Sequence, residues 1–426
     1  MGTIAEKLNN VINCKKAIRT SINNKGGTLT ESDKFSDYST AIDNLSGGSG
    51  LVINLKSIFD KKKNAERFFN GYYQGRFTFF YYVEDLGNLI KYEDTSNVTD
   101  MNTMFYYCSK LTNVPQMDTS NVTNMSTMFY YCTSLTTIPQ MDTSKVTNMN
   151  SMFYSCYGLT TIPQLDTSKV TDMNHMFYNC RSLSAITQIN TSNVTSMKSM
   201  FDGCYSLLDI PQMDTSKVTN MNSMFYSCSS LTTIPQMDTI NVTNMDFMFN
   251  SCYGLTTMPQ FDTSKVTSMG YMFADCHNLL SIPQLNTSKV TNMNSMFYNC
   301  SSLTTITQID VNSATDVGNI FYNCSKLDYL KLLNIKIDIQ IGSDTSWGHL
   351  IQKDCLIQII SELIKPASGT CTLTMGSANT AKLADTYVKL LDDDGSGKYP
   401  FVICESTDEG AMLISDYCTA KSWNLA

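Results

Sequence analysis

Positive charge is scarce in this chain of 426 residues, in which 30 Lys and Arg stand against 38 Asp and Glu. The net charge is −8 and the isoelectric point is near 5.0. A nucleic-acid binder needs a basic surface that displaces counterions from phosphates. The composition therefore argues against nucleic acid as a partner.

Long apolar runs are also missing. No uninterrupted apolar stretch approaches the ~18 residues that a membrane-spanning helix requires. Residues 1–16 alternate charged with apolar positions, and they offer neither the apolar core nor the small-residue cleavage site of a secretory signal. We therefore expect no membrane insertion and no export by an ordinary signal peptide.

Histidine is rare, and the three that occur, His175, His277 and His349, share no position of any repeat. No nucleophile, general base and oxyanion arrangement can be composed from the spacing of residues. The sequence thus predicts a protein that is not an enzyme and that uses no cofactor.

What the chain has is a cysteine every 24 residues without one insertion. The ten positions are Cys108, Cys132, Cys156, Cys180, Cys204, Cys228, Cys252, Cys276, Cys300 and Cys324. Units this short cannot bury their own apolar face, so each must stack on its neighbours and share one continuous core. The period predicts a solenoid of ten repeats over residues 93–327.

The repeat from Asp142 to Leu165 serves as the reference unit. Its apolar residues fall at offsets that place them on one stripe of a short helix, with Ser144 as its cap. They are Val146, Met149, Met152, Phe153 and Cys156. Leu159 to Ile162 is typical of a very short strand. The predicted fold class is an α/β repeat solenoid whose coils each contain a short strand and a short helix.

A proline follows that strand in most repeats, and proline has no N–H to donate to a sheet ladder. We expect this column to mark where the chain leaves the sheet. Its members are Pro115, Pro139, Pro163, Pro211, Pro235, Pro259 and Pro283, with Thr187 and Thr307 in two repeats.

The repeat resembles the BspA-like leucine-rich repeats of bacterial surface proteins, which carry M-F-x-x-C-x-x-L-T followed by D-T-S-x-V-T-x-M. The resemblance covers about Asp94 to Leu327 and implies a leucine-rich-repeat-like solenoid in a surface or adhesive setting. This chain departs from it by having I-P-Q-M-D where family members often carry a longer leucine-rich strand, which argues against a broad concave sheet.

The flanks are expected to attach and to cap the solenoid. Residues 1–48 are predicted to form a helical attachment or oligomerisation module that ends in a Gly-rich linker. Its apolar spacing fits either a coiled coil or an amphipathic helix packed on a second helix, Asp37–Leu45. Residues 51–92 and 328–426 are the predicted N-terminal and C-terminal caps, the latter with an exposed hairpin turn at Asp392–Gly395.

Two polar columns of the repeat raise the question of a metal. The cysteines match the inward column of leucine-rich repeats better than a zinc site, whose ligands are unequally spaced. An aspartate column precedes Thr or Ser at a turn, where its side chains can accept backbone N–H bonds. Its members are Asp118, Asp142, Asp166, Asp214, Asp238, Asp262 and Asp310. We expect buried, unpaired cysteines, turn-forming aspartates and no metal.

The candidate binding residues are tyrosines, each one position after the core phenylalanine. They are Tyr106, Tyr130, Tyr154, Tyr178, Tyr226, Tyr298 and Tyr322. On a helical wheel this position points away from the buried stripe, so the rings could stack on sugar faces or pack against a partner. Alternatively, they shield one another and cover the coil edge. A second candidate is a row of exposed threonine pairs that includes Thr136-Thr137 and Thr160-Thr161.

The expected function is host-surface recognition or adhesion by a phage tail, fibre or other virion protein. Segments at both ends resemble phage proteins: residues 1–45 their short N-terminal helical pieces, and Leu373–Leu383 with Ala420–Ala426 the closing segment of such arrays. The partners would be other virion proteins, bound through residues 1–48, and a host-surface glycan or protein. Assembly of the chain with copies of itself is a further alternative. A bacterial surface adhesin is the alternative, and a glycan-degrading enzyme a less favoured one.

Overall fold

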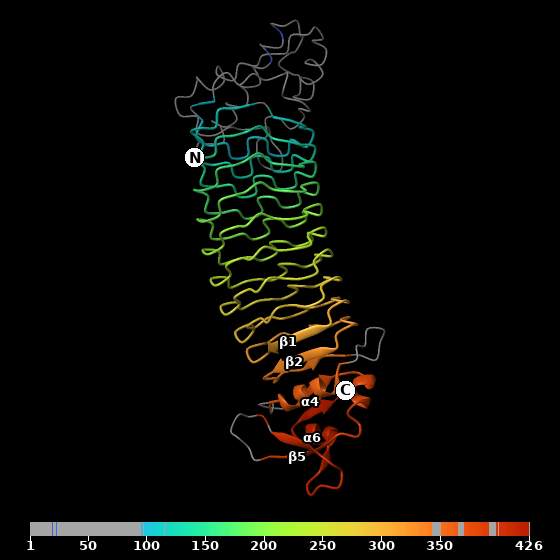
Figure 1. The fold of residues 1–426 in the computed structure, drawn as a ribbon. Helices are drawn as coiled ribbons and strands as arrows, with labels where there is room; N and C mark the ends of the chain where they lie inside the picture. Colours follow the sequence, from blue (N-terminus) through green and yellow to red (C-terminus); the bar gives the residue numbers. More distant parts are fainter. Residues whose placement is uncertain are drawn as a thin grey trace. The chain divides into compact units, whose positions relative to one another are not determined.

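The computed structural model describes residues 19, 23, 95–96, 98–114, 116–342, 351–364, 370–391, 398 and 400–425. The predicted attachment module and N-terminal cap lie outside these residues, except for positions 19 and 23. The chain divides into two compact units, residues 1–194 and 195–426, and the division falls inside the repeats. Figure 1 shows the stacked coils of each unit.

The predicted helix in each coil is wrong, because residues 150–155 form a succession of turns. The N–H of Met152 donates to Met149 O at 3.2 Å within the coil, whereas the N–H of Phe153 donates to Met176 O of the next coil at 2.9 Å. Ser151 and Ser155 have φ angles of 54° and 57°, which an α-helix does not allow. Bonding between coils thus takes the amides that a helix would use internally.

The parallel pairing of the coils occurs where the helix was expected to begin. In the first unit Asn124 bridges Asn148, and Asn148 bridges Asp172. In the second unit the same bridge recurs from Ser196 to Asp316. The predicted cap, Ser144, instead donates its backbone N–H to Asp142 Oδ1 at 3.0 Å.

The predicted core is confirmed. Val146, Met149, Met152, Phe153 and Cys156 are all fully buried, and their equivalents in the other described coils are buried too, except Val98, which is half-buried. The core phenylalanines stack face to face, with centroids 5.3–5.5 Å apart in the first unit and 5.6–5.9 Å apart in the second. One ring per coil therefore forms a continuous column inside each unit.

The short strand predicted before the proline is present in only one of the coils that the structure describes. Strand β1, Thr305–Asp310, passes through Thr307 and pairs in parallel with β2, Tyr329–Leu333. The coil ending at Pro163 has no strand there. Proline cannot donate to the ladder and restricts the residue before it, which disfavours a strand in the proline coils. The coil with Thr187 in this column also has no strand, so the absence of proline is not sufficient to form one.

Side chains bond the coils to one another just after the proline. Gln140 Nε2 donates to Gln164 O at 2.6 Å, and Thr143 Oγ1 donates to Asp166 O at 2.9 Å. Equivalent bonds recur in both units. These contacts supply the cohesion between coils that the proline removes from the backbone.

The C-terminal part of the second unit ends in two small sheets (Figure 1). The first sheet is parallel and has the order β3 (Ile339–Gln340), β4 (Cys371–Thr374), β8 (Trp423–Leu425). The second sheet is antiparallel and has the order β6 (Phe401–Cys404), β5 (Tyr387–Leu390), β7 (Met412–Leu413). Three helices connect these strands: α4 (Lys353–Ser361) follows β3, α5 (Ser377–Ala381) follows β4, and α6 (Ile414–Ala420) follows β7.

The indole of Trp423 helps to hold this region together. It is buried, and its Nε1–H donates to Ile364 O at 3.0 Å. The turn predicted at Asp392–Gly395 lies outside the described residues, although β5 and β6 on either side of it form an antiparallel hairpin. Within the described part of the chain, no helix is long and apolar enough to cross a membrane.

Candidate binding surface

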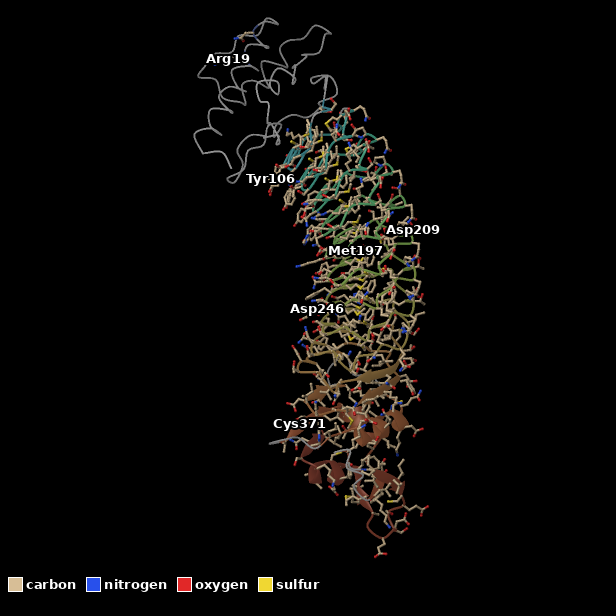
Figure 2. The ribbon with its side chains drawn as sticks, turned by 90° about the vertical axis from the view of Figure 1, so that its left-hand side faces the viewer. Arg19, Tyr106, Met197, Asp209, Asp246 and Cys371 are labelled. Atoms are coloured by element: carbon tan, nitrogen blue, oxygen red, sulfur yellow. The ribbon has the colours of Figure 1, made fainter. Side chains whose placement is uncertain are left out.

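Four of the predicted tyrosines form one stack in the first unit. Tyr106, Tyr130, Tyr154 and Tyr178, which we call the tyrosine ladder, have successive centroid distances of 4.8, 4.4 and 4.3 Å and interplanar angles of 9°, 14° and 9°. Figure 2 shows Tyr106 at the edge of its unit. All four rings are half-buried. These side chains lie at the coil surface as predicted, although the helix on which that prediction was based is absent from these coils.

The local backbone explains why core and surface rings are adjacent in sequence. The N–H of Phe153 donates to the next coil, whereas the N–H of Tyr154 turns back to Ser151 O at 3.2 Å. Successive residues thus face in different directions: Phe153 has no exposed surface and Tyr154 is half-buried. From Tyr106 to Tyr178, each successive coil adds one ring to both columns.

A second group of rings lies beside the ladder and was not singled out from the sequence. Tyr107 and Tyr131 stack at 4.7 Å and 2°, and Tyr131 meets the edge of Tyr157 at 6.3 Å. Both stacked residues have left-handed φ angles, 60° and 61°. The signal in the sequence was the consecutive Tyr pair, whose strained backbone only the structure reveals.

The ring faces inside the tyrosine ladder are covered by one another. Tyr154 contacts Tyr130 on one face and Tyr178 on the other, which leaves its edge for a ligand. Burial, followed by the neighbouring phenols, raises the pKa of the Tyr154 hydroxyl, which therefore remains a hydrogen-bond donor at neutral pH. Stacking of a sugar on a ring face is thus unavailable within the ladder.

The positively charged side chain of Arg181 lies beside these rings. The guanidinium of Arg181 lies 4.5 Å from the centroid of the Tyr157 ring, a distance at which the ring's quadrupole attracts the positive charge. The Arg181 side chain is exposed and also donates from Nε to Asn179 Oδ1 at 2.9 Å. Aromatic edges, phenol hydroxyls and one ordered guanidinium therefore lie together on the first unit.

The structure does not bring the other three predicted tyrosines into the ladder. In the second unit Tyr298 and Tyr322 stack as a pair at 4.8 Å, and Tyr226 meets Phe247 edge-on at 6.3 Å. Asn250 and Ala274 occupy the tyrosine position in the two intervening coils and are buried. There an adjacent column supplies a half-buried and an exposed aromatic side chain.

That adjacent column contains Phe247 and Tyr271, which stack at 4.9 Å and 7°. Their φ angles are 57° and 56°, in a region that bulky residues rarely adopt. Asp202, also at the tyrosine position, is half-buried, and the desolvation of its carboxyl group raises its pKa to about 7. These aromatics and this carboxyl group were not among the candidates chosen from the sequence.

The threonine pairs lie at a different part of the coil. Thr136 and Thr160 are exposed, and their Oγ1 atoms donate to the carbonyl oxygens of Thr112 and Thr136 at 3.3 and 3.4 Å. Because these hydroxyls already donate between coils, they offer a partner only their remaining acceptor capacity.

The repeat cysteines and aspartates have the structural roles expected of them. All ten repeat cysteines are buried and none of the ten forms a disulfide, and Cys156 Sγ donates to Phe129 O at 3.0 Å. Each predicted aspartate accepts the N–H of the residue two positions later. Over the described residues, no group of three or more His, Cys, Asp or Glu side chains is arranged to hold a metal ion.

The coils thus define a repeat solenoid that displays stacked aromatic side chains. The family model described as "Mycoplasma protein of unknown function, DUF285" matches residues 77–164, 156–254 and 232–331, which together cover more than half of the chain. The chain belongs to this family. No curated protein matches the sequence.

Several solved structures are similar to the chain at low identity, and they are leucine-rich-repeat proteins. A leucine-rich-repeat protein of T. pallidum is 20% identical, covers 45% of this chain and 76% of its own, and has a TM-score of 0.29. One from Eubacterium ventriosum is 19% identical, covers 57% and 77%, and scores 0.33. A leucine-rich cell surface protein from Faecalibacterium prausnitzii is 19% identical, covers 55% and 83%, and scores 0.23.

Proposed function

We propose that this chain is a non-enzymatic adhesion protein that binds a protein partner through the tyrosine ladder. The observation that carries the proposal is the stack of four half-buried rings at 4.3–4.8 Å. Tyrosine contributes a large, rigid contact area with a polar tip, which is why it is abundant in surfaces that recognise proteins. The stacked rings lose little side-chain entropy on binding, because the fold already holds them.

Two features favour a protein over a sugar as the partner of this surface. The ring faces that a sugar would stack on are covered within the ladder. Ring edges, phenol groups and the Arg181 guanidinium line this surface, and these suit the mixed polar and apolar surface of a protein. A host-surface glycan is therefore the less favoured partner for the ladder.

The setting we propose is the surface of a phage virion, with residues 1–48 binding other virion proteins and the coils directed toward the host. The phage-like segments at both ends of the sequence support it. The alternative is a bacterial surface adhesin, which the similarity to a leucine-rich cell surface protein favours. A glycan-degrading enzyme is the least favoured alternative, because it would require paired carboxylates at a cleavage site and the repeat does not supply an evident pair.

The partner class is tested on intact cells. The fluorescently labelled full chain is applied to a panel of gut bacteria, with half of each culture first shaved with proteinase K. We expect binding to at least one species, loss of that binding after shaving, and loss with Tyr130→Ser combined with Tyr154→Ser. Binding that survives shaving would identify a glycan, and absence of binding to every species would contradict adhesion.

The setting is tested separately by mass spectrometry of purified virions and of washed cell envelopes. A virion protein should be found in the particles, and a chain lacking residues 1–48 should be absent from them while its coils stay folded. Recovery in the envelope fraction alone would establish the adhesin instead. Incorporation of the shortened chain would assign attachment to the coils or caps.

A further inference from the structure

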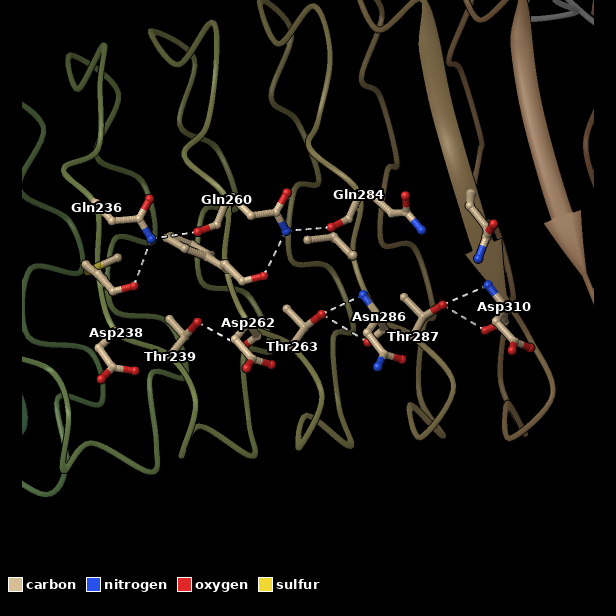
Figure 3. A pocket seen from close by; sticks show the side chains of 14 residues that line it. Gln236, Asp238, Thr239, Gln260, Asp262, Thr263, Gln284, Asn286, Thr287 and Asp310 are labelled. Atoms are coloured by element: carbon tan, nitrogen blue, oxygen red, sulfur yellow. Dashed lines mark hydrogen bonds between the residues drawn. The ribbon is translucent and has the colours of Figure 1, made fainter.

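The second unit contains an open groove of about 850 Å³, in a part of the coil other than the aromatic columns. It runs across successive coils from Gln236 to Asp310, and Figure 3 shows the residues that line it. Its floor is closed by Met237, Phe261 and Leu285, which are buried. Its walls carry one glutamine and one Asp or Asn per coil. We call this cavity the polar groove.

The glutamines change role along the polar groove. Gln236 Nε2 donates to Gln260 O and Met237 O at 2.6 and 3.2 Å, and Gln260 Nε2 donates to Gln284 O and Phe261 O at 2.7 and 3.0 Å (Figure 3). Both side chains thereby use their donors and keep Oε1 as an acceptor. In the part of the chain that the structure describes, the carboxamides of Gln284 and Gln308 have no hydrogen-bond partner.

The end of the glutamine series coincides with the start of β1. Gln308 lies within this strand, which pairs with β2 and has a register irregularity between Ile306 and Ile309. The backbone there follows a different path from that of the proline coils, so the glutamine bond to the next coil is not repeated. The carboxamides of Gln284 and Gln308, which can both donate and accept, therefore lie beside those of Gln236 and Gln260, which can only accept.

The charges along the polar groove are few and mixed. Asp238, Asp262 and Asp310 contribute carboxylates, whereas Asn286 occupies the same column in the third of the four coils. Hydrogen bonds from Ser264, aided by the ammonium of Lys265, hold the pKa of Asp262 below its usual value. Lysine thus offsets part of the acidic charge, which weakens the case for a polycationic ligand.

Backbone pairing with an added peptide strand is also disfavoured. The carbonyl oxygens of Gln260 and Gln284 already accept from glutamine side chains, and those of Asp262, Asn286 and Asp310 accept from threonine hydroxyls at 2.8–3.0 Å. A strand added here would find the acceptors of its ladder occupied. Recognition must therefore come from side chains.

We propose that the polar groove binds a neutral polysaccharide chain that lies across the coils. A sugar hydroxyl both donates and accepts, which matches the free amides of Gln284 and Gln308 followed by the acceptors Gln236, Gln260 and the aspartates. The site is separate from the tyrosine ladder, and the two can succeed or fail independently.

The test probes an array of immobilised neutral polysaccharides, namely glucans, mannans and galactans, with the full chain. We expect retention on at least one glycan, and a loss of affinity of about tenfold or more when Gln284→Ala is combined with Gln308→Ala. Neither side chain makes a hydrogen bond to the residues that the structure describes, so the melting temperature should not change. Retention should persist near 1 M salt, at which exposed charge pairs are screened.

The matched control is Gln140→Ala with Gln164→Ala, the same change outside the polar groove, and it should leave retention unchanged. A Tyr130→Ser and Tyr154→Ser chain should also be retained, which separates this site from the proposed adhesion surface. Absence of binding to every neutral glycan, or equal retention of the Gln284→Ala and Gln308→Ala chain, would overturn the proposal. Retention that disappears at high salt would point to an ionic ligand instead and would equally overturn it.

Discussion

The thiol of Cys156 donates to the carbonyl oxygen of Phe129 in the preceding coil at 3.0 Å. The same donation recurs at Cys132, Cys180 and Cys228 at 3.0–3.1 Å. Phe129 O also accepts the backbone N–H of Cys132 at 3.1 Å, so the thiol adds a second, uncharged donation between coils in the dry interior. The cysteine column is therefore part of the bonding between coils.

We predict that the ten repeat cysteines are reduced and inaccessible in the folded chain. Native thiol counting should detect the half-exposed Cys371 and Cys404 but not the repeat cysteines, which should react only in denaturant. A Cys371→Ser and Cys404→Ser chain provides the control, because its native count should fall by two. Rapid native labelling of most repeat cysteines, or their recovery as disulfides, would refute the buried column.

Stability should fall as the pH rises above about 9, because the core thiols must stay protonated. Burial raises the pKa of Cys324 to about 12 from its usual value of 9.0. Between these values the unfolded chain has lost a proton that the folded chain keeps, so unfolding becomes more favourable with increasing pH. Melting temperatures measured from pH 8 to 11 test this, and Cys324→Ala should reduce the slope. A flat profile would contradict it.

Adjacent aromatic residues should differ sharply in their contribution to stability. Phe153→Ala should cost about 3–5 kcal/mol, because it removes a fully buried ring from the phenylalanine column. Tyr154→Ala should cost about 1–2 kcal/mol, since it removes two stacking contacts from a half-buried ring. Denaturant unfolding of both variants measures the difference. Equal losses would show that the two columns are wrongly assigned.

Glutamines of the same column should also differ in their contribution to stability, according to whether their side chains hydrogen-bond to the next coil. Gln140→Ala removes donations to Gln164 O and Met141 O and should cost about 1 kcal/mol. Gln308→Ala removes no hydrogen bond within the described structure and should leave the denaturation midpoint within error. Similar losses for the two changes would mean that the glutamine bonds do not hold the coils together.

The repeat determined which side chains are buried, but not the path of the backbone. Buried residues at the offsets of Val146, Met149, Met152, Phe153 and Cys156 fit a helix and a series of turns equally well. The turns require left-handed residues such as Ser151 and Ser155, and non-glycine residues fill nearly all of these positions, so no glycine signal marked them.

The tyrosine positions could be predicted from their place after the core phenylalanine, because that place does not depend on the helix. The contacts of the rings could not, since stacking follows from the rise between coils and from substitutions in neighbouring columns. Phe247 and Tyr271 illustrate this, as their rings replace the missing tyrosines from a position with a disfavoured backbone. The glutamine series was visible in the sequence, but its bonds between coils were not.

The central claim is that the tyrosine ladder binds the partner, and comparing two surfaces of the same coils tests it most directly. Cell adsorption is measured for Tyr130→Ser with Tyr154→Ser and for the matched pair Thr136→Ala with Thr160→Ala, with melting temperatures alongside. We predict that the tyrosine chain stays folded and loses adsorption, whereas the threonine chain adsorbs like the parent. Undiminished adsorption of a folded tyrosine chain, or loss only in the threonine chain, would contradict the account.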